Sequence, residues 1–359
     1  MRKTNFDFQV ILDDAADIGL EYLNFFKKLK NGNILITGGG GFLLSYFIEI
    51  VHILNINYNL KINLYIYDLF KNGLDDRLLN YKKDKHIKFY KKDVSKKFEI
   101  KDTYDLIIHG ATIASPTFYK KYPIETIKVN TLGYINILDQ IINHKKLKNF
   151  IYMSSSEIYG DPPNDMVPTS EDYNGNVSIV GSRACYDESK RIGETISVNY
   201  YNSFKLPIKI IRPFNVYGPG QSLKDARFMP DVISNIKNSK NIFMYSNGKP
   251  TRSFCYIADQ IRGILEVLAY GKNGQSYNVG NTFEISMLEA AKKIKNIANK
   301  NLKIIFKKNK QKNYNQDSPN RRCPNIKKLK KLNGWSPKYN FENGVSRTLK
   351  FYKIINWIF

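Results

Sequence analysis

Short apolar runs alternate with stretches of helical periodicity over the first two thirds of the chain. Five apolar runs end at small or polar residues: 33–37, 62–67, 105–109, 150–153 and 208–211. Helical patterns run from Phe42 to about Leu54, over 123–144 and over 184–204. Apolar strands that alternate with helices are typical of a parallel sheet buried on both faces. The pattern therefore predicts an α/β fold with a Rossmann-type, doubly wound parallel sheet.

The pattern weakens after the fifth strand, in segments rich in Lys, Asn, Pro and Gly. We interpret these segments as a smaller α/β substrate-binding domain over the carboxyl ends of the strands, where open α/β sheets bind ligands. The chain is thus divided into a helical N-terminal extension (1–30), the Rossmann domain (31–212 and 251–272), the substrate-binding domain (213–250 and 273–350) and a C-terminal tail (351–359).

Composition places the chain among soluble globular proteins. Of its 359 residues, 42% are hydrophobic and 25% are charged. No apolar run reaches the roughly 18 residues of a membrane span, and no apolar stretch of a secretory signal follows the start. The cysteines Cys185, Cys255 and Cys323 form no C-x-x-C pair, so neither a disulfide framework nor a metal site is expected. We expect a reduced, cytoplasmic protein without membrane contact.

The net charge of +24 raises the hypothesis of nucleic-acid binding. The charge is mostly Lys, spread along the chain beside many Asn and Ile residues, as the codon bias of an AT-rich genome would produce. A basic surface also suits a polyanionic small substrate, because it raises the local concentration of phosphates. We therefore expect no nucleic-acid partner.

A glycine-rich loop lies between the first strand and the helix that follows it, as a dinucleotide loop must. In Thr37-Gly38-Gly39-Gly40-Gly41-Phe42-Leu43, Gly38 permits a tight turn and Gly41 lets backbone N–H groups approach a pyrophosphate. Asp68 ends the next strand, where a carboxylate accepts hydrogen bonds from the adenosine ribose. A carboxylate there repels a 2′-phosphate, so NAD is favoured over NADP as the cofactor.

One position departs from this motif. The third glycine of the spacing would fall at position 44, which is Leu44. Because that glycine permits close packing of helix and strand, we expect Leu44 to push the helix outward or to be absorbed by smaller neighbours.

Candidate chemistry lies at the start of the helix over 184–204. Tyr186 and Lys190 are four residues apart and share one helical face. A neighbouring ammonium and a nicotinamide cation would lower the pKa of the phenol, so Tyr186 could remove a hydroxyl proton as hydride leaves the same carbon. The strand before this helix ends in Ser154-Ser155-Ser156-Glu157, which brings hydroxyls and a carboxylate to the same edge.

These motifs together resemble the extended short-chain dehydrogenase/reductases of the NAD-dependent epimerase/dehydratase family, and most closely its UDP-glucuronate decarboxylases. The resemblance covers about 31–350, and Gly175 to Arg191 is its most discriminating stretch. The matching stretches are Thr37 to Leu43, His109 to Pro116, Ser155 to Pro162, Gly175 to Arg191, Arg212 to Pro219, Thr251 to Tyr256 and Gly334 to Pro337.

The resemblance implies decarboxylation of UDP-glucuronate to UDP-xylose through a 4-keto intermediate. Tyr186 would take the proton of the sugar 4-hydroxyl while NAD takes the C4 hydride. The ketone is β to the C5 carboxylate, so CO₂ can leave, and the hydride then returns to C4. Arg252 would hold the carboxylate or the diphosphate, and Glu157, with Ser155, would handle the proton at C5.

The resemblance also implies further site residues and a homodimer that pairs through two long helices, with the helices near 123–144 and 184–204 as candidates. The cofactor contacts implied are Gly38, Gly41, Phe42, Leu43, Asp68, Asp93, Val94, Ala111, Tyr186 and Lys190. The implied contacts to the nucleotide-diphosphate sugar are Tyr119, Asn215, Arg227, Tyr245, Arg252 and Arg321.

Two alternatives stay open. Ser156 argues against a 4,6-dehydratase, which usually carries an Asp there, and Glu157 argues against a simple 4-epimerase. If the cofactor exchanges, however, the same site could act as a reductase or epimerase on a CDP- or UDP-linked sugar of surface-polysaccharide synthesis. The other alternative is a non-catalytic Rossmann protein that senses NAD or binds RNA.

Overall fold

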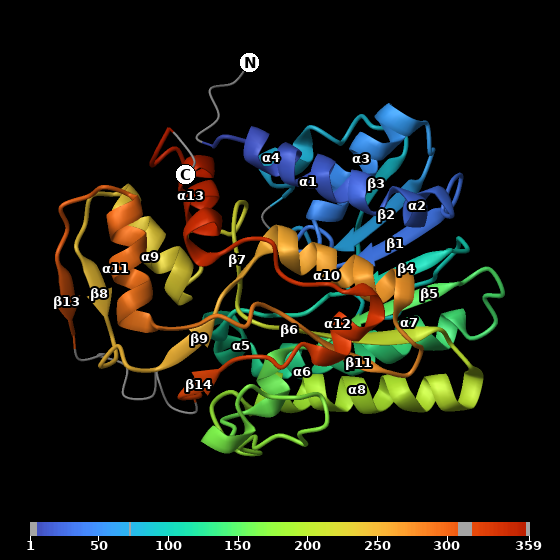
Figure 1. Cartoon of the computed structure of the whole chain (residues 1–359). Coiled ribbons are helices and arrows are strands. Elements are labelled where there is room, and N and C mark those ends of the chain that lie inside the picture. The colour runs from blue at the N-terminus through green and yellow to red at the C-terminus, as the bar shows by residue number, and fades with distance from the viewer. Residues whose placement is uncertain (1–5, 72, 308–317, 357–359) are drawn as a thin grey trace.

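A seven-stranded parallel sheet forms the centre of the molecule (Figure 1). The computed structural model describes residues 6–71, 73–307 and 318–356. The strand order is β11-β6-β5-β4-β1-β2-β3, which confirms the predicted doubly wound α/β fold. The strands are β1 (Asn33–Thr37), β2 (Asn63–Asp68), β3 (Ile87–Lys91), β4 (Leu106–His109), β5 (Asn149–Met153), β6 (Ile208–Pro213) and β11 (Ser276–Val279).

Two of these strands were not apparent from the apolar pattern. Strand β3 lies at the edge of the sheet and is only partly buried, so its sequence contains no continuous apolar run. At the other edge, β11 pairs in parallel with β6. The sheet therefore takes a strand from the segment 273–350, which the sequence places in the substrate-binding domain.

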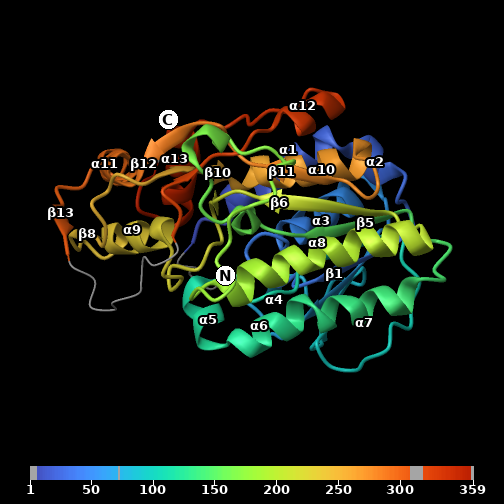
Figure 2. The ribbon, with the colours of Figure 1, turned by 90° about the horizontal axis from the view of Figure 1, so that it is seen from below.

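Helices cover both faces of the sheet (Figure 2). One face carries α6 (Pro123–Asn130), α7 (Leu132–Ile141) and α8 (Ala184–Phe204), and the other carries α3 (Tyr46–Tyr58) and α10 (Ile257–Tyr270). The bounds of α8 agree with the predicted range. In contrast, α3 begins at Tyr46 and not at Phe42, because residues 42–45 form turns in which Tyr46 N–H bonds the carbonyl of Leu43.

A smaller α/β part stands beyond the carboxyl ends of the strands, at the left of Figure 1. Its helices are α9 (Phe228–Lys237) and α11 (Met287–Ile297). Short sheets tie it together: β12 (Glu284–Ser286) with β9 (Thr251–Ser253) and β14 (Arg321–Arg322), β13 (Ile304–Phe306) with β8 (Ile242–Met244), and β10 (Cys255–Tyr256) with β7 (Val216–Tyr217). The remaining short helices are α4 (Asp76–Leu79), α5 (Pro116–Lys121), α12 (Lys327–Asn333), η1 (Ser156–Tyr159) and η2 (Asn164–Met166).

The helical N-terminal extension forms α1 (Gln9–Glu21) and α2 (Leu23–Lys27). Helix α1 packs against α3, α10 and the C-terminal α13 (Phe341–Phe351). Asp14 on α1 is fully buried, accepts a hydrogen bond from Tyr256 at 2.6 Å and pairs with Arg347 of α13 at 2.7 Å. The extension thus ties the sheet domain to the C-terminal helix.

Within the described ranges, no helix combines the length and the apolar character needed to cross a bilayer.

Candidate functional site

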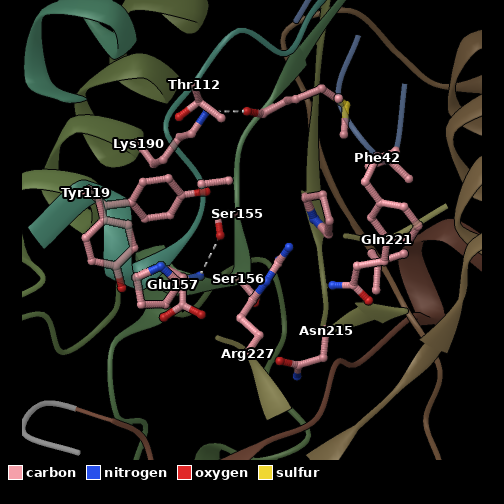
Figure 3. A pocket seen from close by; sticks show the side chains of 18 of the residues that line it. Phe42, Thr112, Tyr119, Ser155, Ser156, Glu157, Lys190, Asn215, Gln221 and Arg227 are labelled. Carbon is pink, nitrogen blue, oxygen red and sulfur yellow. Dashed lines mark hydrogen bonds between the residues drawn. The ribbon is translucent and has the colours of Figure 1, made fainter. Parts of the chain in front are cut away.

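A cavity of about 640 Å³ opens at the carboxyl ends of the central strands, a size typical of small-molecule sites. The sheet domain contributes the glycine loop, the ends of β4 and β5 and the start of α8. The smaller part contributes α9, β9 and β14. In Figure 3, Tyr119, Ser155 and Glu157 lie on one side of this cavity, and Phe42 and Gln221 lie on the other.

The glycine loop is shaped for close approach of a ligand to the backbone. Gly38 has a φ of +69°, and a Cβ there would lie 2.7 Å from the carbonyl oxygen of Gly110. A Cβ on Gly40 would lie 3.1 Å from Asp68. Asp68 accepts a hydrogen bond from the Gly40 N–H at 3.0 Å, so its carboxylate is held beside the loop at the edge of the cavity.

Leu44 is accommodated by a glycine on the neighbouring strand end. Its side chain is buried, and its Cδ1 lies only 2.4 Å from the position that a Cβ on Gly110 would occupy. The small neighbour that absorbs Leu44 is therefore Gly110, which directly follows β4.

This packing predicts the effect of Gly110→Ala. The added methyl group would collide with Leu44, so we expect a loss of about 1–3 kcal/mol in the free energy of unfolding. The loss should be much smaller when Leu44 is also replaced by Ala, since the double variant has room for both side chains. Chemical denaturation of the two single variants and the double variant measures this coupling. Equal losses in both backgrounds would contradict it.

Tyr186 and Lys190 lie on the cavity wall, one turn apart on α8. Both are buried, and the Lys190 ammonium donates to the carbonyl of Met153 at 2.8 Å (Figure 3). Tyr186 stacks on Tyr119 with a ring separation of 5.0 Å, and its phenol shares a hydrogen bond with Ser155. A strand end and a helix start thus place a phenol, an ammonium and a hydroxyl together, as the motifs predict.

In the protein without cofactor, burial has the largest effect on the pKa values of Tyr186 and Lys190. Burial raises the pKa of Tyr186 to about 12, against the hydrogen bond with Ser155, which lowers it. Burial also lowers the pKa of Lys190 to about 7, against the charge of Glu194. The protein alone thus holds Tyr186 as a neutral phenol, whereas we expected the ammonium and a cofactor cation together to lower its pKa. Of these two cations, only the Lys190 ammonium belongs to the chain itself, and the other would come with the cofactor.

Glu157 is clamped between two guanidinium groups. Arg183, at the start of α8, and Arg322, on β14, both donate to its carboxylate. Burial alone would raise the pKa of Glu157, but the charges of Arg183 and Arg322 outweigh it and lower the pKa to about 2. Glu157 is therefore a carboxylate at any working pH.

Arg252 lies beside this clamp and pairs with no carboxylate among the residues described. Its guanidinium donates to the carbonyl of Thr251 at 2.7 Å and more weakly to Asn320 and Ser318. Burial and the charge of Arg322 lower its pKa to about 9. A half-buried arginine that forms no ion pair with a described carboxylate, although the charges of Glu157 and Asp161 act on it, indicates a site for an anionic ligand group.

Three further polar atoms on the cavity wall are buried without a hydrogen-bond partner in the described part of the chain. They are Thr112 Oγ1, Tyr119 Oη and Asn215 Nδ2. Because unsatisfied buried polar groups are costly, we interpret these atoms as ready contacts for a polar ligand.

The cavity brings together most of the predicted site residues. Those that line it are Gly38, Gly41, Phe42, Leu43, Asp68, Tyr119, Ser155, Glu157, Tyr186, Lys190, Asn215, Arg227 and Arg252. Five others do not line it: Asp93, Val94, Ala111, Tyr245 and Arg321. Ala111 still packs directly behind Gly38, and Arg321 pairs with Glu284 at 2.8 Å outside the cavity.

Two charged residues of the cavity were missed at the sequence level. Arg322 faces Glu157, while its neighbour Arg321 points away, as alternate residues of a strand must. Arg183 lies within the stretch that carries the resemblance, but no pattern in the sequence assigned it a contact. One signal could have found it: Asp187 lies four residues after Arg183, which is the spacing of an ion pair within a helix, and this pair would have placed Arg183 at the start of α8.

The chain is similar in sequence to UDP-glucuronic acid decarboxylases. UDP-glucuronic acid decarboxylase 6 of Arabidopsis thaliana is 32% identical over 321 residues, which cover 89% of this chain and 88% of that protein. UDP-glucuronic acid decarboxylase 1 of Xenopus tropicalis is 30% identical over 92% of this chain and 74% of that protein.

Solved structures show the same fold at lower identity. The UDP-glucuronic acid 4-epimerase of Bacillus cereus, in complex with UDP-glucuronic acid and NAD, has a TM-score of 0.75 at 24% identity and covers 89% of this chain and 99% of that chain. The UDP-glucose 4-epimerase of Thermotoga maritima has a TM-score of 0.76 at 22% identity and covers 89% and 98%. The model of the NAD-dependent epimerase/dehydratase family matches residues 34–280, and this chain belongs to that family.

Proposed function

We propose that this protein decarboxylates UDP-glucuronate to UDP-xylose in a cycle that regenerates its NAD. The observation that carries the proposal is the charge of the cavity end beside Tyr186. Arg183, Arg252 and Arg322 lie around the carboxylate of Glu157, and the second carboxyl beside Arg183, that of Asp187, has a pKa raised to about 7, so three cations face fewer than three full negative charges. A neutral hexose offers nothing to balance that charge, whereas the sugar carboxylate of a uronic acid does.

The glycine loop and Asp68 suit a dinucleotide cofactor. The Gly38 and Gly40 positions leave no room for side chains, and Asp68 stands beside them with a carboxylate suited to ribose hydroxyls. When bound there, NAD supplies a reversible hydride acceptor for C4 of the sugar.

Side chains of the protein itself carry out the proton transfer and bind the substrate. Tyr186 would act as a phenolate, which the positive charges of Lys190 and of the bound nicotinamide stabilise. This phenolate takes the proton of the sugar 4-hydroxyl and becomes a neutral phenol. Ser155 shares a hydrogen bond with the same phenol. The ketone formed at C4 accepts the electron pair that CO₂ leaves behind, and Arg252 holds the carboxylate in place before it departs.

Glu157 carries no proton that it could donate to C5 at working pH, since its pKa is about 2. We infer that it orients a water molecule that protonates C5 and that it fixes Arg183 and Arg322. This refines the role expected for Glu157 from the resemblance.

The test is incubation of the purified protein with UDP-glucuronate, UDP-glucose and CDP- and dTDP-hexoses, with and without added NADH or NADPH, followed by mass spectrometry. We expect loss of CO₂ from UDP-glucuronate without added reductant. Reduction of a UDP- or CDP-sugar that depends on added NADH or NADPH would contradict the proposal and favour a reductase.

We also propose a homodimer in which α6 and α8 of two copies pack together. Large apolar side chains are exposed on this side of the molecule, among them Ile124 and Ile127 on α6 and Ile192 on α8. Exposed apolar patches of this kind mark protein contacts. We expect Ile124→Glu with Ile192→Glu to give monomers in sedimentation equilibrium. Ile56→Glu on α3, which is more exposed than either residue and lies on the opposite face, is the control and should stay dimeric.

A further inference from the structure

Asp187 follows the proposed base Tyr186 directly, yet it has no role in the proposed reaction. It is buried at the first turn of α8. Its Oδ2 lies 3.6 Å from Nε of Arg183, and its Oδ1 has no hydrogen-bond partner among the described residues. A buried carboxylate that makes one ion pair and no hydrogen bond by its second oxygen is costly, which indicates a role beyond packing.

The charges form a row that runs from α8 to β14. Asp187 pairs with Arg183, Arg183 donates to Glu157, and Glu157 accepts from Arg322 on its other oxygen. Arg322 is held at its far end by the carbonyl of Gly160 at 3.1 Å. Arg183 has no such backbone contact, so Asp187 is its second anchor in the described part of the chain.

We propose that Asp187 is a positioning residue that holds Arg183 against Glu157 and so leaves Arg252 as the cation that receives the sugar carboxylate. Without this anchor, Arg183 can swing from Glu157 to the incoming carboxylate. The ligand would then be bound by two arginines and misplaced relative to Glu157. The inference rests on the proposed function for the identity of that ligand.

The surroundings of Asp187 leave its carboxyl group only partly ionised near neutral pH. Burial, followed by the charge of Glu157, raises the pKa of Asp187 to about 7, against the charge of Arg183. The ionisable groups that interact with it are Arg183, Glu157, Arg322, Tyr119, Cys185 and Tyr186. Asp187 and Arg183 also line a second cavity of about 280 Å³, through which water can reach them. The anchor is therefore best tested at about pH 8.5, where Asp187 is ionised.

Asp187→Asn keeps the size of the side chain and removes its charge. We expect kcat for UDP-glucuronate to fall at least tenfold while KM stays equal or falls several-fold, since the cavity gains positive charge. The affinity for UDP-glucose, which has no carboxylate, should not change in calorimetry. Asp187→Glu, which keeps the charge, should recover part of the lost kcat. Glu188→Gln removes a charge from the same turn, where Glu188 pairs with Arg191 outside the cavity, and should behave as wild type.

Several outcomes would overturn the inference. Weaker binding of UDP-glucuronate and UDP-glucose alike would indicate a merely structural role for Asp187. A crystal structure of Asp187→Asn in which Arg183 keeps its bond to Glu157 would reject the anchor directly, whatever reaction the protein catalyses. Absence of CO₂ release by the wild-type protein would instead reject the proposed function, and that crystal structure would still decide the anchor.

Discussion

Replacing Tyr186 by phenylalanine is expected to reduce turnover by roughly 10³-fold, which is the scale of a general base in the reaction. The phenol lines the cavity beside Lys190, whereas Glu194, the other acceptor that α8 places near Lys190, does not line it, and the hydrogen bond of the phenol is with Ser155. Phenylalanine keeps the ring that stacks on Tyr119 but cannot take a proton. CO₂ release from UDP-glucuronate measures the loss, and quantification of NAD in the purified variant shows whether the cofactor is still held.

The fold should tolerate this change, because the variant removes one oxygen from a cavity wall. Tyr200→Phe is the matched control: it lies on the same helix, but its phenol donates to Asp139 at the surface. We expect the control to turn over as the wild type does and both variants to bind NAD. Unchanged turnover in Tyr186→Phe would remove the proposed base from the mechanism.

The parts of the site that local sequence determines could be predicted. Gly38 and Asp68 mark the ends of adjacent parallel strands, and such ends meet at one edge of a sheet. Tyr186 and Lys190 share a face because they are one turn apart on a helix whose bounds the apolar pattern predicts. The central sheet followed from the same pattern, apart from its two edge strands.

The remaining features depend on contacts between distant segments. Which of Arg321 and Arg322 faces the cavity is set by the register of β14 against β9, more than sixty residues away in the chain. Accommodation of Leu44 depends on Gly110, a contact that no periodicity encodes. The pKa of Tyr186 depends on how deeply the assembled cavity buries it, and burial was not foreseen as the dominant effect.

The clamp around Glu157 leads to the second large effect. In Glu157→Gln, Arg183 and Arg322 lose the carboxylate between them. Removal of one partner from a buried ion pair costs about 3–5 kcal/mol of stability. The groups that oxidise C4 remain, so we expect the variant to reduce its bound NAD and then to stall, with overall turnover lower by roughly 10²-fold. Absorbance of bound NADH during turnover measures the stalled fraction.

Glu284→Gln separates this effect from the general loss of an arginine partner. Glu284 pairs with Arg321, the neighbour of Arg322, but outside the cavity, so its removal perturbs the same strand without touching the clamp. We expect this control to lose some stability and to keep its turnover. If Glu157→Gln forms product at the wild-type rate, Glu157 has no part in the chemistry. If it fails to reduce NAD at all, the clamp serves the oxidation step as well, because Arg252 then no longer holds the sugar where Tyr186 can reach its 4-hydroxyl.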